Sequence, residues 1–269
     1  MEGLSARSLG LALALMLLCL VSPSLASSRK SCQALTKDPL SGCPQGTLMV
    51  GPGSEYPTIQ SAILSLPHDN SSHTILVLPG NYTEQVNITR PGPVTLLGQT
   101  SHPTLDSKNT VNVIWHNATG TASTGSYDNL YTSTLTIAPT QNSSATGSGP
   151  DGNPVPANTP FGNTNFRAYN LNFINDYLPY SAGPSLALSV SYANAGFYYC
   201  GFYSYQDTVS LSTTQAAETL LMTPRSTLVS WETPISTNQP WLDRPISSMA
   251  LALSGFSLAL CYCALAEVE

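Results

Sequence analysis

The chain has 269 residues, only 9% of them charged, and a formal net charge of −6. It contains no run of basic residues, which argues against a nucleic-acid partner. Ser, Thr, Asn, Gly and Pro are abundant, as is typical of a secreted, turn-rich β protein rather than a helical one.

Residues 1–26 are predicted to be a signal peptide. Arg7 precedes an apolar run at 9–21, and Ser24-Leu25-Ala26 has the small-x-small pattern of a cleavage site. The apolar run is too short to span a membrane stably. We therefore expect a secreted, extracellular protein. Asn-x-Ser/Thr sequons fit a glycoprotein of the secretory route, and they begin at Asn70, Asn81, Asn87, Asn117 and Asn142.

The cysteines indicate one disulfide and no metal site. Cys32 and Cys43 are close enough in sequence for a bridge that pins the mature N-terminus. Cys200 lies in an apolar stretch and is expected to be a buried thiol. Cys261 and Cys263 form a C-x-C without a nearby His, so a zinc site is not expected.

Beyond an irregular leader at 27–46, the pattern predicts one short helix followed by strands. Apolar residues recur at helical spacing between Ile59 and Leu66, and Pro67 ends the run, which indicates a short capping helix. Short apolar stretches separated by Gly, Pro and Asn then predict strands at 74–78, 94–97, 134–137, 166–174, 186–190 and 197–202.

Two all-β architectures fit this pattern. A β-sandwich would show hairpin turns and clean alternation of apolar and polar residues. A parallel β-helix would show short apolar strands at loose intervals with polar turns. The hairpin dipeptide Asn-Gly is absent and the strand spacing is irregular. The pattern therefore favours the β-helix.

Residues 50–209 resemble the pectin methylesterases (pectinesterases, which are aspartyl esterases), particularly the fungal branch. The matching segments occur in family order at 53–63, 74–86, 94–98, 165–173 and 183–208. The most specific is the aromatic stretch from Gly196 that runs into Gln206-Asp207-Thr208. The resemblance implies a right-handed parallel β-helix over 47–209, truncated, with a short N-terminal capping helix.

The resemblance also implies the site. Asp207 would be the general acid and then base, and Gln206 would help hold the oxyanion. One carboxylate attacks the methyl ester while a second protonates methanol and activates water, and an amide donor stabilises the tetrahedral oxygen. Tyr203 and Tyr205 are candidates for contact with sugar rings, although strand aromatics on an outer face would look the same. No metal or organic cofactor is needed.

The family pattern breaks in two places. Pro184 stands where the family usually has a second oxyanion Gln. The nucleophile motif Asp-Phe-[Ile/Leu]-[Phe/Tyr]-Gly and the Gly-Arg-Pro-Trp motif are both absent, and Asp243 is the only Asp after Asp207. Residues 210–269 are thus predicted to be a tail foreign to the family. Its apolar part, 249–266, suits a buried tail or a lipid-anchor signal.

A retained intron with a shifted reading frame is a third interpretation of this tail. Read two bases later, permitted codons for residues 231–253 can spell a string that contains Asp-Phe-Leu-Tyr-Gly, the missing motif. Codons 209–210 can encode an intron donor, 221–223 a branch point and 224–225 an acceptor. Retaining such an intron would shift the reading frame in the direction that the alternative reading of residues 231–253 requires.

We therefore expect a secreted, monomeric carbohydrate esterase that hydrolyses methyl esters of galacturonate in pectin (methylated homogalacturonan) during cell-wall modification. This exact chain is expected to be inactive. The alternative is a non-catalytic β-helix that binds polysaccharide or acts at a surface. A lyase on the same fold would usually need carboxylate clusters for calcium, and only Asp176 and Asp207 stand in this half of the predicted helix.

Overall fold

The structure, a computed structural model, describes residues 24–121, 128–140, 158–178, 182–212, 220–222 and 227–230. Within these ranges the chain forms a right-handed parallel β-helix, as the sequence predicted. Every strand pairing is parallel. Cys261, Cys263, Asn142 and the apolar tail lie outside the described residues.

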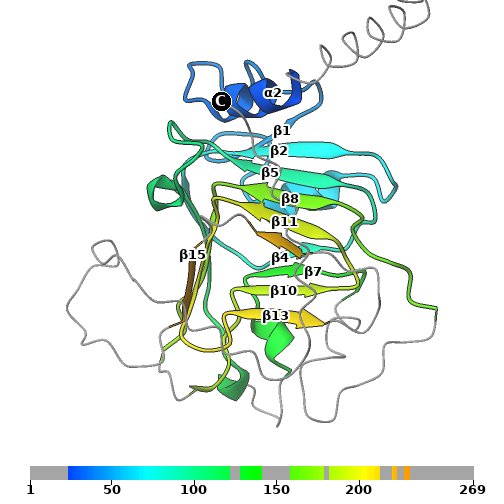
Figure 1. The fold of residues 1–269 in the computed structure, drawn as a ribbon, viewed down its shortest axis with the longest axis vertical. Helices are drawn as coiled ribbons and strands as arrows, with labels where there is room; N and C mark the ends of the chain where they lie inside the picture. The colour runs from blue at the N-terminus through cyan, green and yellow to red at the C-terminus, as the bar shows by residue number, and fades with distance from the viewer. Residues whose placement is uncertain are drawn as a thin grey trace, which may run out of the picture. The chain divides into compact units, whose positions relative to one another are not determined.

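The strands repeat in a fixed order and build three sheets (Figure 1). Sheet A has the order β1-β2-β5-β8-β11-β14, sheet B the order β15-β12-β9-β6-β3, and sheet C the order β13-β10-β7-β4. From β2 onward, each coil passes once through A, B and C. The strands are β1 (Leu48–Val50), β2 (His73–Val77), β3 (Gly80–Thr83), β4 (Val86–Ile88), β5 (Val94–Gly98), β6 (Val111–Trp115), β7 (Leu135–Ile137), β8 (Phe166–Tyr169), β9 (Asn172–Asn175), β10 (Leu188–Ser191), β11 (Ala195–Tyr198), β12 (Gly201–Ser204), β13 (Val209–Ser212), β14 (Leu220–Met222) and β15 (Thr227–Ser230).

The core consists of side chains stacked in register along the coil. In sheet B, Val113 pairs with Phe173 and Phe173 with Phe202, and all three are fully buried. The rings of Phe173 and Phe202 stack with centroids 5.6 Å apart, and Phe197 of sheet A meets Phe202 edge-on at 5.0 Å. Offset and edge-on aromatic contacts of this kind add to the hydrophobic stabilisation of a core.

Two predicted strands, 166–174 and 197–202, are each divided in the structure, so these two predictions were wrong. Asn170 and Tyr199 have φ angles of 58° and 55°, in the left-handed region. One left-handed residue turns the chain from sheet A to sheet B, so β8 is followed by β9 and β11 by β12. The apolar pattern runs through the corner because residues on both sides face the same core.

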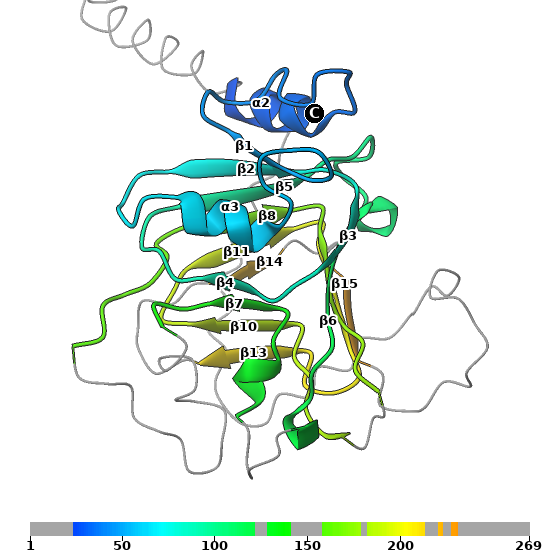
Figure 2. The ribbon, with the colours of Figure 1, turned by 180° about the vertical axis from the view of Figure 1, so that it is seen from behind.

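The predicted capping helix is confirmed as α3 (Ile59–Ser65) (Figure 2). Thr58 caps its N-terminus, and Ile59, Ala62 and Ile63 are buried. The carboxylate of Glu84 accepts hydrogen bonds from the backbone N–H groups of Ile59 and Gln60 at 2.7 and 2.8 Å. A negative charge at a helix N-terminus is stabilising. Burial nevertheless raises the pKa of Glu84.

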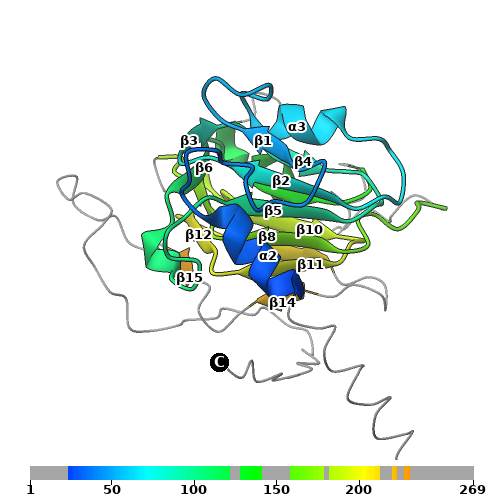
Figure 3. The same ribbon diagram turned by 90° about the horizontal axis from the view of Figure 1, so that it is seen from above.

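The leader was predicted to be irregular, but it contains α2 (Ser24–Gln33) (Figure 3). The predicted disulfide between Cys32 and Cys43 is confirmed. Cys32 packs with Leu76 and Leu97 of sheet A, which gives the helix an apolar contact that its own short sequence does not reveal. Tertiary contact here stabilises a helix too short to persist alone.

Cys200 is a buried free thiol, as predicted. Burial raises its pKa to about 12, so the thiol stays protonated at neutral pH. No described helix is long and apolar enough to cross a membrane.

The parallel coil extends past residue 209, where the family-like segment was expected to end. β13, β14 and β15 pair in parallel with β10, β11 and β12. These additional strands provide partners for the last complete coil, including the strand that precedes Gln206 and Asp207.

The aromatic stack predicts that shortening one of its side chains strongly lowers the stability of the fold. Phe202→Ala should lower the free energy of unfolding by about 3–5 kcal/mol, because it removes a fully buried ring and leaves a cavity. Urea denaturation measures this change. Leu64→Ala is the control, since Leu64 lies on α3 with 74% of its surface exposed, and should change stability by less than about 0.5 kcal/mol. Equal midpoints for the two variants would contradict the assignment of the stack as the core.

Candidate active site

The candidate site lies where neighbouring strands of sheet B end. Trp115, the last residue of β6, pairs in register with Asn175, the last residue of β9. The residues that follow, His116 and Asp176, form an ion pair. Tyr205 follows β12 at the equivalent place, where the charge of Asp176 helps raise its pKa, second to burial. The parallel register thus gathers side chains from three coils.

Gln206 and Asp207 form the turn that leaves this edge toward sheet C. The carbonyl of Gln206 accepts a hydrogen bond from the backbone N–H of Ser185 at 3.1 Å. Asp207 has a φ angle of 55°, a conformation that Asp and Asn tolerate better than most residues. Ser204 Oγ donates to Thr208 Oγ1 at 3.0 Å and closes the turn from the other side. The turn is therefore held at both ends while the Asp207 residue is exposed.

The electrostatic surroundings favour the protonated form of Asp207. Loss of hydration raises the pKa of its carboxyl group, and a side-chain hydrogen bond from Asn129 opposes that shift. Asn129 belongs to the short 3₁₀ helix η3 (Asn129–Thr132). Asp176 follows the same pattern, since burial raises its pKa and the neighbouring His116 lowers it. Two carboxyl groups with raised pKa values on one edge are typical of acid–base sites.

Asn175 holds the surrounding segments together. Its fully buried side chain donates from Nδ2 to the carbonyl oxygens of Thr132, Asn117 and Leu186 at 2.8, 2.9 and 3.1 Å. Thr132 Oγ1 in turn accepts from the backbone N–H of Leu186 at 2.9 Å. The amide thereby fixes η3, the segment after β6 and the segment before β10 around the turn at Gln206. A substitution at Asn175 would disturb all three.

Buried polar atoms without hydrogen-bond partners cluster in these same segments. Among the described residues there are five such side-chain atoms, and one of them, Asp176 Oδ1, lies in the ion pair with His116. The other four belong to Trp115, Asn129, Ser133 and Ser185. Native proteins leave few buried polar groups unpaired, and those that remain often mark functional sites. All five such atoms of the described residues therefore lie at this edge of sheet B or in the segments beside it.

The two candidate tyrosines occupy different places. Tyr205 is at the strand end but only 7% exposed, which leaves little surface for a sugar ring. Tyr203 lies on the outer face of sheet B above Gly201, where a Cβ on the glycine would come within 2.5 Å of the ring. Burial raises the pKa of Tyr203, helped by the charge of Asp106. The structure therefore places only Tyr205 beside Gln206 and Asp207.

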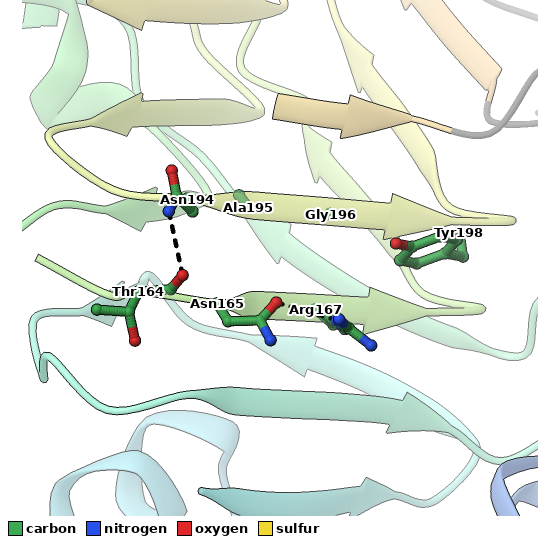
Figure 4. A pocket seen from close by; sticks show the side chains of 7 residues that line it. All are labelled: Thr164, Asn165, Arg167, Asn194, Ala195, Gly196 and Tyr198. Atoms are coloured by element: carbon green, nitrogen blue, oxygen red, sulfur yellow. Dashed lines mark hydrogen bonds between the residues drawn. The ribbon is translucent and has the colours of Figure 1, made fainter. Parts of the chain in front are cut away.

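A polar groove on sheet A is a separate feature (Figure 4). Within it Asn194 Nδ2 donates to the carbonyl of Thr164 at 3.1 Å, and Arg167 Nε donates to Asn165 Oδ1 at 3.0 Å. None of the predicted site residues lines this groove; its lining residues are Thr164, Asn165, Arg167, Asn194, Ala195, Gly196 and Tyr198. Over the described ranges, no group of three or more His, Cys, Asp or Glu side chains could hold a metal ion.

Sequence reasoning located Gln206 and Asp207 but missed their neighbours. His116, Asn129 and Ser185 match no motif, and each comes from a different segment of the chain. Asp176 had a usable signal, because it comes just after the predicted strand at 166–174, as Gln206 and Asp207 come after the one at 197–202. Their convergence depends on the parallel register and on the Asn175 hydrogen bonds, which the local sequence does not encode.

Comparison with known proteins gives one consistent group. No protein-family model matches the chain. It is 30% identical over 166 residues to pectinesterase A of Emericella nidulans, covering 62% of this chain and 42% of the relative. It is 30% identical over 196 residues to a protein named probable pectinesterase A of Aspergillus flavus, covering 72% and 50%. The chain thus spans about half the length of these curated relatives, or less.

The fold comparison agrees with the sequence comparison. The crystal structure of the pectin methylesterase of Aspergillus niger in deglycosylated form superposes with a TM-score of 0.52 and 27% identity. The match covers 69% of this chain and 50% of that one. Similar sequence and the same succession of parallel coils point to one origin. Over the part it shares with these proteins, the chain belongs to the pectin methylesterase family.

Proposed function

We propose that the site at Asp207 belongs to a secreted carbohydrate esterase whose substrate is the methyl ester of galacturonate in pectin. The observation that carries this proposal is the exposed Asp207 carboxyl, whose pKa is raised by lost hydration, beside the amide of Gln206. An acid that keeps its proton near the working pH can protonate departing methanol and afterwards activate water. The relatives named pectinesterase support this reaction class.

In the proposed roles, Asp207 is the acid and then the base, and Gln206 donates a hydrogen bond to the oxyanion. Tyr205 would border the ester, and Tyr203 would contact a sugar ring farther along sheet B. We further propose that this polypeptide binds methylated pectin as a monomer without hydrolysing it, because the family's nucleophile and Arg motifs are absent from its sequence.

Binding and turnover can be measured separately. We expect the chain to bind highly methylated homogalacturonan, as followed by calorimetry, and to release no methanol above background. Tyr203→Ala should weaken binding by more than about 1 kcal/mol, the cost that marks an energetically important interface residue, because Tyr203 lies on the outer face of sheet B and keeps exposed surface for a sugar ring. The groove variant Asn165→Ala should bind as the parent does. Methanol release would overturn the inactivity, and absence of binding would overturn the substrate assignment.

The acid role predicts a specific titration. The carboxyl of Asp207, followed by carbon-13 NMR, should titrate above the ordinary aspartate value of 3.8. Asn129→Ala should raise this pKa further, because it removes the hydrogen bond that favours the charged form. Asn165→Ala should leave it unchanged. A pKa at or below 3.8 in the parent would contradict the acid role.

The same shift predicts how stability depends on pH. A carboxyl whose pKa is higher in the folded than in the unfolded chain stabilises the fold fully below the unfolded value. That contribution is lost as pH rises through the folded value. Asp207→Asn removes the titration and keeps a residue suited to a positive φ. Its stability relative to the parent should therefore rise as pH increases from below 3.8, and a constant difference in urea denaturation would count against the shift.

We propose that residues after Thr208 derive from a retained intron and a shifted reading frame. The support is that permitted codons of residues 209–225 can encode the splice signals, and that permitted codons of residues 231–253, read two bases later, can encode the nucleophile motif. Sequencing of mature messenger RNA across codons 205–260 should reveal a shorter message that restores the Asp-Phe-Leu-Tyr-Gly motif. If every message retains the stretch, the interpretation fails, whereas the assignments at Gln206 and Asp207 remain testable by binding.

A further inference from the structure

A chain of hydrogen-bonded amide side chains runs from the buried Gln33 of α2 to the exposed Asn81 of sheet B. Each amide nitrogen donates to the amide oxygen of the next residue, at 3.0, 3.2, 3.0, 2.9 and 2.8 Å in turn. We call this chain the amide ladder. In the order of donation it consists of Gln33, Asn170, Asn109, Asn172, Asn112 and Asn81.

Two backbone carbonyls fix the direction of the ladder. Gln33 Nε2 also donates to the carbonyl of Gly98 at 2.9 Å, and Asn109 Nδ2 donates to that of Tyr199 at 2.9 Å. A carbonyl can only accept, so the nitrogen of each of these two amides must be the atom that faces it. The remaining amides have to follow the same direction, since two facing nitrogens or two facing oxygens would not bond.

This direction determines which atom of Asn81 is free. Asn81 is the last residue, and its Oδ1 accepts from Asn112. Its Nδ2 has no hydrogen-bond partner in the part of the chain that the structure describes. Asn81 and Thr83 are exposed on one side of β3, while Tyr82 between them is 7% exposed. The Asn-x-Thr sequon therefore presents both of its polar side chains to solvent.

The other described sequons lack this combination. Asn87 is half-buried, and the amide of Gln60 binds its backbone, with Gln60 Oε1 2.7 Å from its N–H. Asn117 is also half-buried, and its backbone is bound on both sides by the amide of Asn175. Asn70 is exposed but belongs to no ladder. Only the sequon at Asn81 pairs exposure with an amide oxygen that is already anchored.

Asn81 also lies on the strand at the end of a sheet. Among the described strands, β3 stands at the end of sheet B, with β6 as its one partner in that sheet. An end strand is a template for pairing with another chain, and proteins protect such edges with charge, proline or a covering group. β3 carries neither Lys, Arg nor Pro in its sequence Gly-Asn-Tyr-Thr. A bulky hydrophilic group at Asn81 would provide the protection.

We propose that Asn81 carries an N-linked glycan that anchors on the end of the amide ladder and shields the edge of sheet B. The proposal rests on the proposed secretion. The donor is a lipid-pyrophosphate-linked oligosaccharide: its sugar C1 forms a bond to Nδ2, the C1–O bond to the pyrophosphate breaks, and Nδ2 loses one proton. Oδ1 keeps its lone pairs, so the hydrogen bond from Asn112 survives the modification.

The attachment can be tested in the full chain secreted from a fungal host, once behind its own N-terminal segment and once behind a host signal sequence. Release of glycans by an amidase in ¹⁸O water, followed by peptide mass spectrometry, marks each modified Asn. We expect Asn81 to be marked. Thr83→Ala should remove one glycan, because it destroys the sequon and leaves the ladder. Asn112→Ala should keep the glycan, because it breaks the ladder and leaves the sequon.

The two expression forms distinguish a failure of the glycan site from a failure of the proposed secretion. If Asn81 is modified only behind the host signal, the proposed signal peptide fails and the glycan site stands. An unmodified Asn81 behind the host signal overturns the site. The shielding role has its own readout, since Thr83→Ala should show increased self-association in sedimentation velocity. The control Ser72→Ala, which removes the sequon at Asn70, should sediment as the parent does. Equal sedimentation of the two variants would overturn the shielding role.

Discussion

The in-register parallel stacking of sheet B is the constraint on which the other features depend. Parallel pairing without offset places equivalent residues of successive coils directly above one another. The inward positions become the stack that includes Phe173 and Phe202, with rings 5.6 Å apart. The outward positions of the same strands carry Asn172, Asn112 and Asn81, the last three members of the amide ladder. The strand ends become the edge where Asp176 and Tyr205 meet. One register therefore serves the core, the surface and the candidate active site.

The candidate site combines rigid support with incomplete hydrogen bonding. Asn175 satisfies three carbonyl groups and fixes the segments around the turn at Gln206. Nearby, buried atoms of Asn129 and Ser185 have no hydrogen-bond partner in the described residues. An unpaired buried polar group costs stability, commonly about 1–3 kcal/mol. Several such groups lie at this one edge of the described structure, next to the Asn175 amide, whose hydrogen bonds are made.

The amide ladder is a second set of polar side chains, and in it the amides bond to one another. Amide groups on the outer face of sheet B bond to one another instead of depending on water alone, and the series is anchored at Gln33 inside the α2 contact. Cys32, one residue earlier, joins the same contact through its disulfide with Cys43. The disulfide closes the N-terminal segment on itself, and the amide of Gln33 links that segment by hydrogen bonds to Gly98 and Asn170, far along the chain. Its helical structure follows from those links rather than from its own propensity.

The sequence by itself determined the class of fold, the capping helix and the disulfide, and it made Gln206-Asp207 the candidate site. These depend on local patterns: apolar strands broken by turn residues, helical spacing between Ile59 and Leu66, and a specific aromatic motif. Only the tertiary structure decided that the strands divide at Asn170 and Tyr199, and that α2 is a helix. It also decided that Asn129 and Ser185 contact the turn, and that Asp176, paired with His116, lies beside Tyr205. The physical reason is that a left-handed corner and a parallel register act between residues distant in sequence, so no local pattern reports them.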